Sequence, residues 1–115
     1  MVKHKFNAKP TTVEGKRFAS KKEADYYRWL MWHKQFGELL FFLRQVPFDL
    51  PGNVKYFVDF AEYWADGEVA FSDVKGAVTP LFNVKKKMVE ELYPIKINIV
   101  TEIPLLSFRG RPDAE

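Results

Sequence analysis

The sequence predicts a single small α/β domain in which two helices flank a mixed β-sheet. Three observations carry this prediction. A helical repeat of apolar residues follows Ser20, strand-like apolar runs fill residues 39–75, and a second helical repeat leads into a final alternating segment after Pro94. The expected order is helix, three strands, helix, strand. A chain of 115 residues has room for one such domain around one core.

The first helix is expected to begin just after Ser20, because Ser20 and Glu23 have the spacing of a capping box. The apolar residues that then recur at helical spacing are Ala24, Tyr27, Leu30 and Met31. Gly37 is a suitable end for the helix. Residues 1–15 carry little apolar periodicity, so we expect them to form a basic N-terminal arm.

Three strands are expected next, over residues 39–50, 55–64 and 68–75. Turn-forming residues separate them. Pro51-Gly52-Asn53 lies between the first two strands, and Ala65-Asp66-Gly67 lies between the second and the third. The second and third strands are expected to form a hairpin.

Thr79 and Pro80 mark the start of the second helix, with Thr79 as the N-cap and Pro80 as the first helical residue. Its apolar stripe is expected to consist of Leu81, Val84, Met88 and Leu92. Pro94 ends this helix, and isoleucines alternate with polar residues in a last strand over residues 95–99. Residues 102–115 are expected to be a C-terminal tail.

Composition excludes several kinds of site. The chain has no cysteine and only two histidines, so thiolate sites and multi-histidine zinc sites are excluded and a hard metal held by oxygen becomes the default. No apolar run approaches the ~20 residues of a membrane-spanning helix, and no apolar signal core is present, so we expect a cytoplasmic protein. The net charge of +3, with clustered lysines, indicates a polyanionic partner, although solvated surface lysines are the alternative.

Two carboxylates, Asp59 and Asp73, stand inside apolar strands, where an unpaired charge is expensive to bury. A two-residue turn between their strands would put them on opposite faces, whereas a three-residue Ala65-Asp66-Gly67 loop would oppose them directly. That loop favours a left-handed last residue, which Gly67 supplies. We therefore expect Asp59 and Asp73 to face each other, with a divalent cation between them or with one of them protonated.

Two further residues belong with this pair. Lys75 is expected on the same face as Asp73, because alternate residues of a strand share a face. Glu23 lies at helical spacing from Tyr27, on or beside the buried face of the first helix. The alternative reading of Glu23 is that its side chain only completes the capping box with Ser20.

This ordered set resembles the pattern of the PD-(D/E)XK nuclease superfamily, with the spacing and size of small phage and archaeal-type Holliday junction resolvases. The motifs are Ser20-Lys21-Lys22-Glu23-Ala24, Val58-Asp59 and Asp73-Val74-Lys75-Gly76, and the resemblance covers roughly residues 15–101. The sequence departs from the pattern at Val58, where the family has a proline, and at Asp73, where glutamate is frequent.

The resemblance implies a restriction-endonuclease-like nuclease domain over residues 16–101 that depends on Mg²⁺, with Mn²⁺ as a substitute. The implied catalytic residues are Glu23, Asp59, Asp73 and Lys75. The implied metal ligands are Glu23, Asp59, Asp73 and the carbonyl of Val74. The basic residues expected to bind nucleic acid are Lys3, Lys5, Lys9, Lys16, Arg17, Lys21, Lys85 and Lys86.

The expected activity is cleavage of a four-way DNA junction, during recombination and repair, by a symmetric homodimer that makes paired nicks. The candidate dimer surface comprises Trp29, Trp32 and residues 39–42, whose apolar surface exceeds what so small a core can cover. One alternative is another structure-specific or nicking DNA nuclease. The other is a non-catalytic nucleic-acid-binding module whose acids are paired with lysines.

Overall fold

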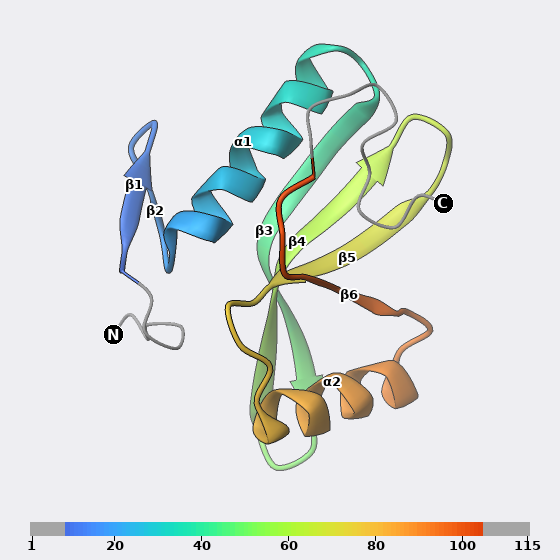
Figure 1. Ribbon diagram of the computed structural model, residues 1–115. Coiled ribbons are helices and arrows are strands. Elements are labelled where there is room, and N and C mark those ends of the chain that lie inside the picture. Colours follow the sequence, from blue (N-terminus) through green and yellow to red (C-terminus); the bar gives the residue numbers. More distant parts are fainter. Residues whose placement is uncertain (1–8, 105–115) are drawn as a thin grey trace.

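The computed structural model describes residues 9–104. Over that range the elements follow in the order β1, β2, α1, β3, β4, β5, α2 and β6 (Figure 1). Strands β3, β4, β5 and β6 form one mixed sheet in that spatial order, while β1 and β2 form a separate hairpin. The predicted α/β domain, with its helix, three strands, helix and strand, is confirmed.

The hairpin of β1 (Thr11–Val13) and β2 (Lys16–Phe18) was not expected from the sequence. Val13 and Phe18 are buried in the core cluster beneath helix α1, so the end of the expected basic arm is folded onto the domain. Most of that arm lies outside the described residues. The hairpin escaped notice because its strands are too short to show an alternating pattern.

Helix α1 (Lys21–Gln35) begins where the capping pattern predicts. The Ser20 hydroxyl accepts a hydrogen bond from the Glu23 N–H at 3.0 Å. Beyond the other end of the helix, Gly37 has a φ of +82°, the left-handed conformation that favours glycine after a helix. Both ends of α1 therefore lie close to the signals that predicted them.

Strands β3 (Leu39–Leu50), β4 (Val54–Trp64) and β5 (Val69–Val74) form an antiparallel meander. The β4–β5 connection is the three-residue loop, since the Trp64 N–H donates to the Glu68 carbonyl at 2.9 Å. Gly67 closes this loop with a φ of +94°. The predicted register of this hairpin is confirmed.

Helix α2 (Pro80–Leu92) starts at the predicted cap, where the Thr79 hydroxyl accepts a hydrogen bond from the Phe82 N–H at 3.1 Å. It connects β5 to β6 (Ile97–Val100), which pairs with β5 in parallel. Neither helix of the described range is long and apolar enough to cross a membrane.

The face that α2 buries differs from the predicted stripe. Leu81, Val84 and Leu92 are 64%, 56% and 54% exposed, whereas Phe82 and Val89 are buried. Contacts at the start of the helix fix its rotation, because Phe82 packs between the Tyr56 ring and the Lys75 ammonium group. The prediction was wrong for these three leucine and valine positions and right for Met88, which packs against the core cluster of α2, because helical spacing alone allows more than one apolar stripe.

The four-stranded sheet forks near its middle. The β4–β5 pairing ends at Phe60 and Ser72; beyond it β4 continues beside β3 alone, while β5 continues beside β6. Helix α2 lies between the two arms, and α1 lies along the other half of β3 and β4 (Figure 1). Each helix has its own core cluster. The first residues beyond the last β4–β5 pair are Asp59 and Asp73.

A buried carboxylate cluster as candidate active site

Asp59 and Asp73 face each other where the sheet forks, as the three-residue loop predicts. Both are buried. The Asp59 N–H donates to Asp73 Oδ1 at 2.9 Å, and the Val74 N–H donates to Asp59 Oδ2 at 2.9 Å. These amides lie just beyond the last paired residues of β4 and β5. The two carboxylates thus accept main-chain hydrogen bonds that a neighbouring strand would otherwise accept.

The pair does not carry two negative charges easily. Burial, together with the nearby Asp59 carboxylate, raises the pKa of Asp73 to about 6, although hydrogen bonds and Lys75 act in the opposite direction. The Tyr56 hydroxyl donates to Asp73 Oδ2. Burial first, and then the Asp73 carboxylate, raise the pKa of Tyr56 well above its ordinary value, so Tyr56 remains a neutral donor.

Helix α1 and strand β3 bring a third acid to the fork. Glu23 is buried, and its Oε2 lies 3.4 Å from the Gln45 amide nitrogen, which also donates to Asp59 Oδ1 at 3.2 Å. The Arg44 guanidinium lies 3.7 Å from the same Glu23 oxygen. The Ser20 half of the capping box forms, while the Glu23 carboxylate reaches β3. The structure therefore brings Glu23, Asp59 and Asp73 into one connected group.

Lys75 follows directly on β5. Its side chain is half-buried, and its Nζ lies 4.3 Å from the centre of the Phe82 ring, a favourable cation–π contact. Its charge lowers the pKa of Asp73, which shows that the ammonium group acts on the carboxylate pair. The role implied for the Val74 carbonyl stays a prediction.

Three residues of this cluster were absent from the predicted site: Arg44, Gln45 and Tyr56. A signal existed for the first two, because Arg44 and Gln45 form a polar pair inside the otherwise apolar run of residues 39–48. No local signal marks Tyr56, whose hydroxyl meets Asp73 only because the two arms of the sheet part at that level.

The predicted nucleic-acid contacts are distributed unevenly. Lys9, Lys16, Arg17 and Lys21 are exposed at the N-terminal side, and Lys85 and Lys86 are half-buried on α2. Lys21 pairs with Asp25 at 2.8 Å, and Lys86 pairs with Glu90 at 2.9 Å. These two lysines are partly neutralised, which weakens their case as phosphate contacts. Lys3 and Lys5 lie outside the described residues.

The acids of the cluster do not form a preassembled metal site, although their chemistry suits a hard cation. Within residues 9–104 no three His, Cys, Asp or Glu side chains stand in a ready metal-binding arrangement, and the Gln45 amide lies between Glu23 and Asp59. The available oxygens are nevertheless carboxylates, which Mg²⁺ prefers. Burial and, after it, the Asp59 carboxylate raise the pKa of Asp73, and a cation bound beside the pair would oppose both effects.

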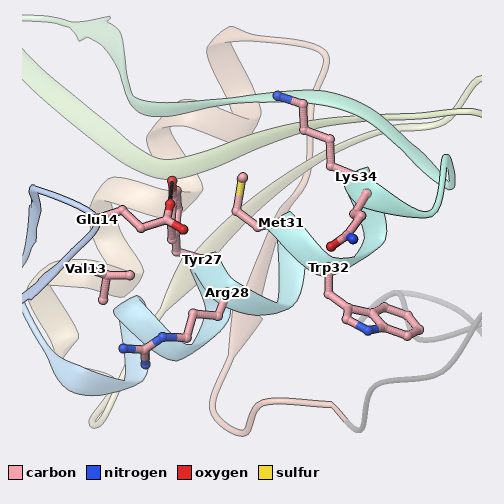
Figure 2. A pocket seen from close by; sticks show the side chains of 8 residues that line it. Val13, Glu14, Tyr27, Arg28, Met31, Trp32 and Lys34 are labelled. Atoms are coloured by element: carbon pink, nitrogen blue, oxygen red, sulfur yellow. Dashed lines mark hydrogen bonds between the residues drawn. The ribbon is translucent and has the colours of Figure 1, made fainter.

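A separate pocket of about 620 Å³ lies between the β1–β2 hairpin and α1 (Figure 2). In Figure 2 Glu14 reaches across to Tyr27, whose hydroxyl donates to the Glu14 carboxylate at 3.2 Å. Trp32 also lines this pocket, but none of the four predicted catalytic residues does. The pocket therefore does not share the residues of the carboxylate cluster.

Fold and site together define a small α/β domain with a buried carboxylate cluster at the fork of a mixed sheet. A family model described as "Protein of unknown function (DUF1064)" matches residues 3–106, and the chain belongs to this family. No curated protein and no solved structure matches the chain.

Proposed function

We propose that this protein is a metal-dependent DNA endonuclease with a site of the PD-(D/E)XK kind. The observation that carries the proposal is the opposed pair Asp59 and Asp73, with Glu23 and Lys75 beside it, at the fork of the sheet. A buried carboxyl whose pKa is raised by burial and by a neighbouring acid, as at Asp73, is typical of functional sites.

Glu23, Asp59 and Asp73, with the Val74 carbonyl, are the residues that would hold Mg²⁺, or Mn²⁺ in its place. The bound ion would activate water and stabilise charge on the phosphate during displacement of the leaving oxygen. The main-chain and Tyr56 hydrogen bonds fix the orientation of the two aspartates. The Lys75 ammonium group, held against Phe82, would orient the attacking water and stabilise the negative charge of the transition state.

The proposed substrate is a four-way DNA junction, and the proposed assembly is a homodimer, because two opposed nicks require two sites related by two-fold symmetry. Trp29 and Leu39 are buried within the chain's own core, so they cannot form the dimer surface as expected. Phe41, Tyr63 and Val69 lie side by side across β3, β4 and β5, and Phe41 and Val69 are exposed. This apolar row is the better candidate surface.

A cleavage assay tests the proposal. A labelled four-way junction, a single-flap substrate and a linear duplex of the same sequence are incubated with the protein in Mg²⁺, in Mn²⁺ or in EDTA. We expect symmetric paired nicks in the junction with either metal and none in EDTA. Light scattering should give twice the mass of one chain.

The matched variants for this assay are Asp59→Asn and Asp66→Asn. Asp66 is an exposed acid in the loop between the same two strands, so its replacement changes the charge equally without touching the fork. We expect Asp59→Asn alone to abolish cleavage while junction binding persists. Cleavage of the flap in preference to the junction would indicate another structure-specific nuclease. Binding without cleavage in either metal would indicate a non-catalytic module.

A further inference from the structure

Gln45 has an unusual backbone conformation for its position. Its φ is +52°, and the other non-glycine residues of the described range with positive φ, Glu14 and Asn53, lie at hairpin turns. Gln45 instead lies inside the long strand β3, between Arg44 and Val46, whose pairing with β4 keeps a constant register. A non-glycine residue in the left-handed conformation inside a strand is strained, and such backbone strain is concentrated at functional sites.

The side chain of Gln45 bridges two buried acids. Its amide nitrogen lies 3.4 Å from Glu23 Oε2 and 3.2 Å from Asp59 Oδ1. The two hydrogens of an amide nitrogen carry partial positive charge, so this one group can donate to two carboxylates at once. The strained backbone therefore places a neutral double donor at the point where two negative side chains approach each other.

We propose that Gln45 is a positioning residue that takes the place of a cation, holding Glu23 and Asp59 together while the site carries no metal. This inference rests on the proposed function, since it assumes that the same carboxylates bind a divalent ion. A metal ion bound jointly by Glu23 Oε2 and Asp59 Oδ1 would take the place of the amide nitrogen, so binding in that position requires these hydrogen bonds to break. An interaction present only in the metal-free state weakens metal affinity by the amount that it stabilises that state.

The test replaces Gln45 with asparagine. Asparagine tolerates a left-handed backbone, but its side chain is one methylene shorter and cannot span both carboxylates. We expect Gln45→Asn to bind Mn²⁺ about tenfold more tightly in calorimetric titration, the order of magnitude expected when hydrogen bonds to charged groups are lost from one state only. The melting temperature of the metal-free protein should fall.

Gln35→Asn is the matched control, because Gln35 is the chain's other glutamine and is exposed at the end of α1. It should leave Mn²⁺ affinity unchanged. If Gln45→Asn does not fold, Gln45→Gly removes the same amide while accepting the positive φ. A second measurement uses the wild-type protein and therefore does not depend on a variant that folds. In its NMR spectrum, diamagnetic Mg²⁺ should shift the side-chain NH₂ resonances of Gln45 but not those of Gln35.

Two results would overturn the inference while leaving the proposed function intact. Unchanged Mn²⁺ affinity in Gln45→Asn would make Gln45 an ordinary structural side chain, and weaker affinity would make it a metal ligand. If the wild-type protein binds neither Mn²⁺ nor Mg²⁺, the inference and the proposed metal-dependent activity both fail. Junction cleavage by the wild-type protein therefore separates the two failures.

Discussion

Strand β4 carries two buried acids three residues apart, Asp59 and Glu62, and their surroundings differ. Glu62 lies beneath α1, where the Tyr26 hydroxyl donates to it at 2.6 Å and the Trp64 indole N–H donates at 3.2 Å. Asp59 also accepts hydrogen bonds, but it faces Asp73 and is linked through Gln45 to Glu23. Both acids accept hydrogen bonds from neutral donors, but only Asp59 also faces a second carboxylate.

The contrast shows that burial alone does not identify a functional carboxylate. Neutral donors compensate a single buried charge and tie it to the core, which is a structural role. Several acids in one place leave negative charge uncompensated, and this destabilises the protein until a cation binds or a proton is taken up. The Asp59 cluster is thus the functional candidate on β4, and Glu62 is the structural one.

The largest expected effect is on cleavage activity, which should distinguish the acids of the cluster from Glu62. Asp59→Asn and Asp73→Asn should each reduce junction cleavage by about a thousandfold or more, since each removes a negatively charged ligand that the proposed metal-dependent chemistry requires. Glu62→Gln should leave the cleavage rate of the folded protein within about threefold of wild type, because Glu62 is not part of the cluster. Single-turnover cleavage rates measure both. Equal losses in all three variants would erase the distinction between the acids.

The next effect concerns Lys75. Lys75→Ala should lower single-turnover cleavage by about a hundredfold, the range expected for a group that positions a proton-transferring water. Junction affinity should change little. Lys87→Ala, which removes an exposed lysine on α2, is the control and should spare turnover. Reduced affinity with unchanged turnover of bound substrate would limit Lys75 to a binding role.

The third effect is on stability as a function of pH, without metal. The pKa of Asp73 rises from 3.8 to about 6 in the folded protein, so the folded state holds an extra proton between these values. The contribution of the Asp73 carboxyl to the free energy of unfolding is therefore highest at low pH. It falls by about 2–3 kcal/mol as the pH rises through 6.

Urea titrations in EDTA at several pH values measure this effect as the difference between wild type and Asp73→Asn. The variant lacks the titrating group, so its free energy of unfolding relative to that of the wild type should rise as the pH rises from 4 to 7. A difference that stays constant with pH would show that Asp73 does not bear the excess charge of the cluster.

The smallest expected effect is on the stability of the protein when Glu62, the acid with a structural role, is replaced. Glu62→Gln should cost about 1 kcal/mol of unfolding free energy, because the amide can still accept from Trp64 but gives Tyr26 a weaker, uncharged partner. Chemical denaturation measures it. Greater stability in the variant would mean that Glu62, like Asp73, is buried at a net cost.

Much of this architecture could be predicted from short-range sequence signals. Ser20 and Thr79 cap the two helices as predicted, and Gly67 fixes the register that opposes Asp59 and Asp73. These signals succeed because each acts within a few residues of the structure it specifies.

The remaining features depend on contacts distant in sequence. The buried face of α2 is set by Tyr56 and Lys75 rather than by its own spacing, and the Tyr56 contact with Asp73 depends on where the sheet forks. The role of Gln45 depends on a backbone angle that glutamine rarely adopts. No pattern in a single sequence reports such an angle.

The main-chain hydrogen bonds of Asp59 and Asp73 affect which residues can indicate whether a relative of this chain is an active enzyme. Both aspartates complete the backbone pairing of two strands, so a descendant that lost all enzymatic activity would still benefit from keeping them. The Lys75 side chain completes no backbone pairing, because an ammonium group cannot accept a hydrogen bond from an amide, and it packs instead against the Phe82 ring. In a family mixing enzymes with inactive members, the lysine would therefore be more informative than the two aspartates, which would persist in both.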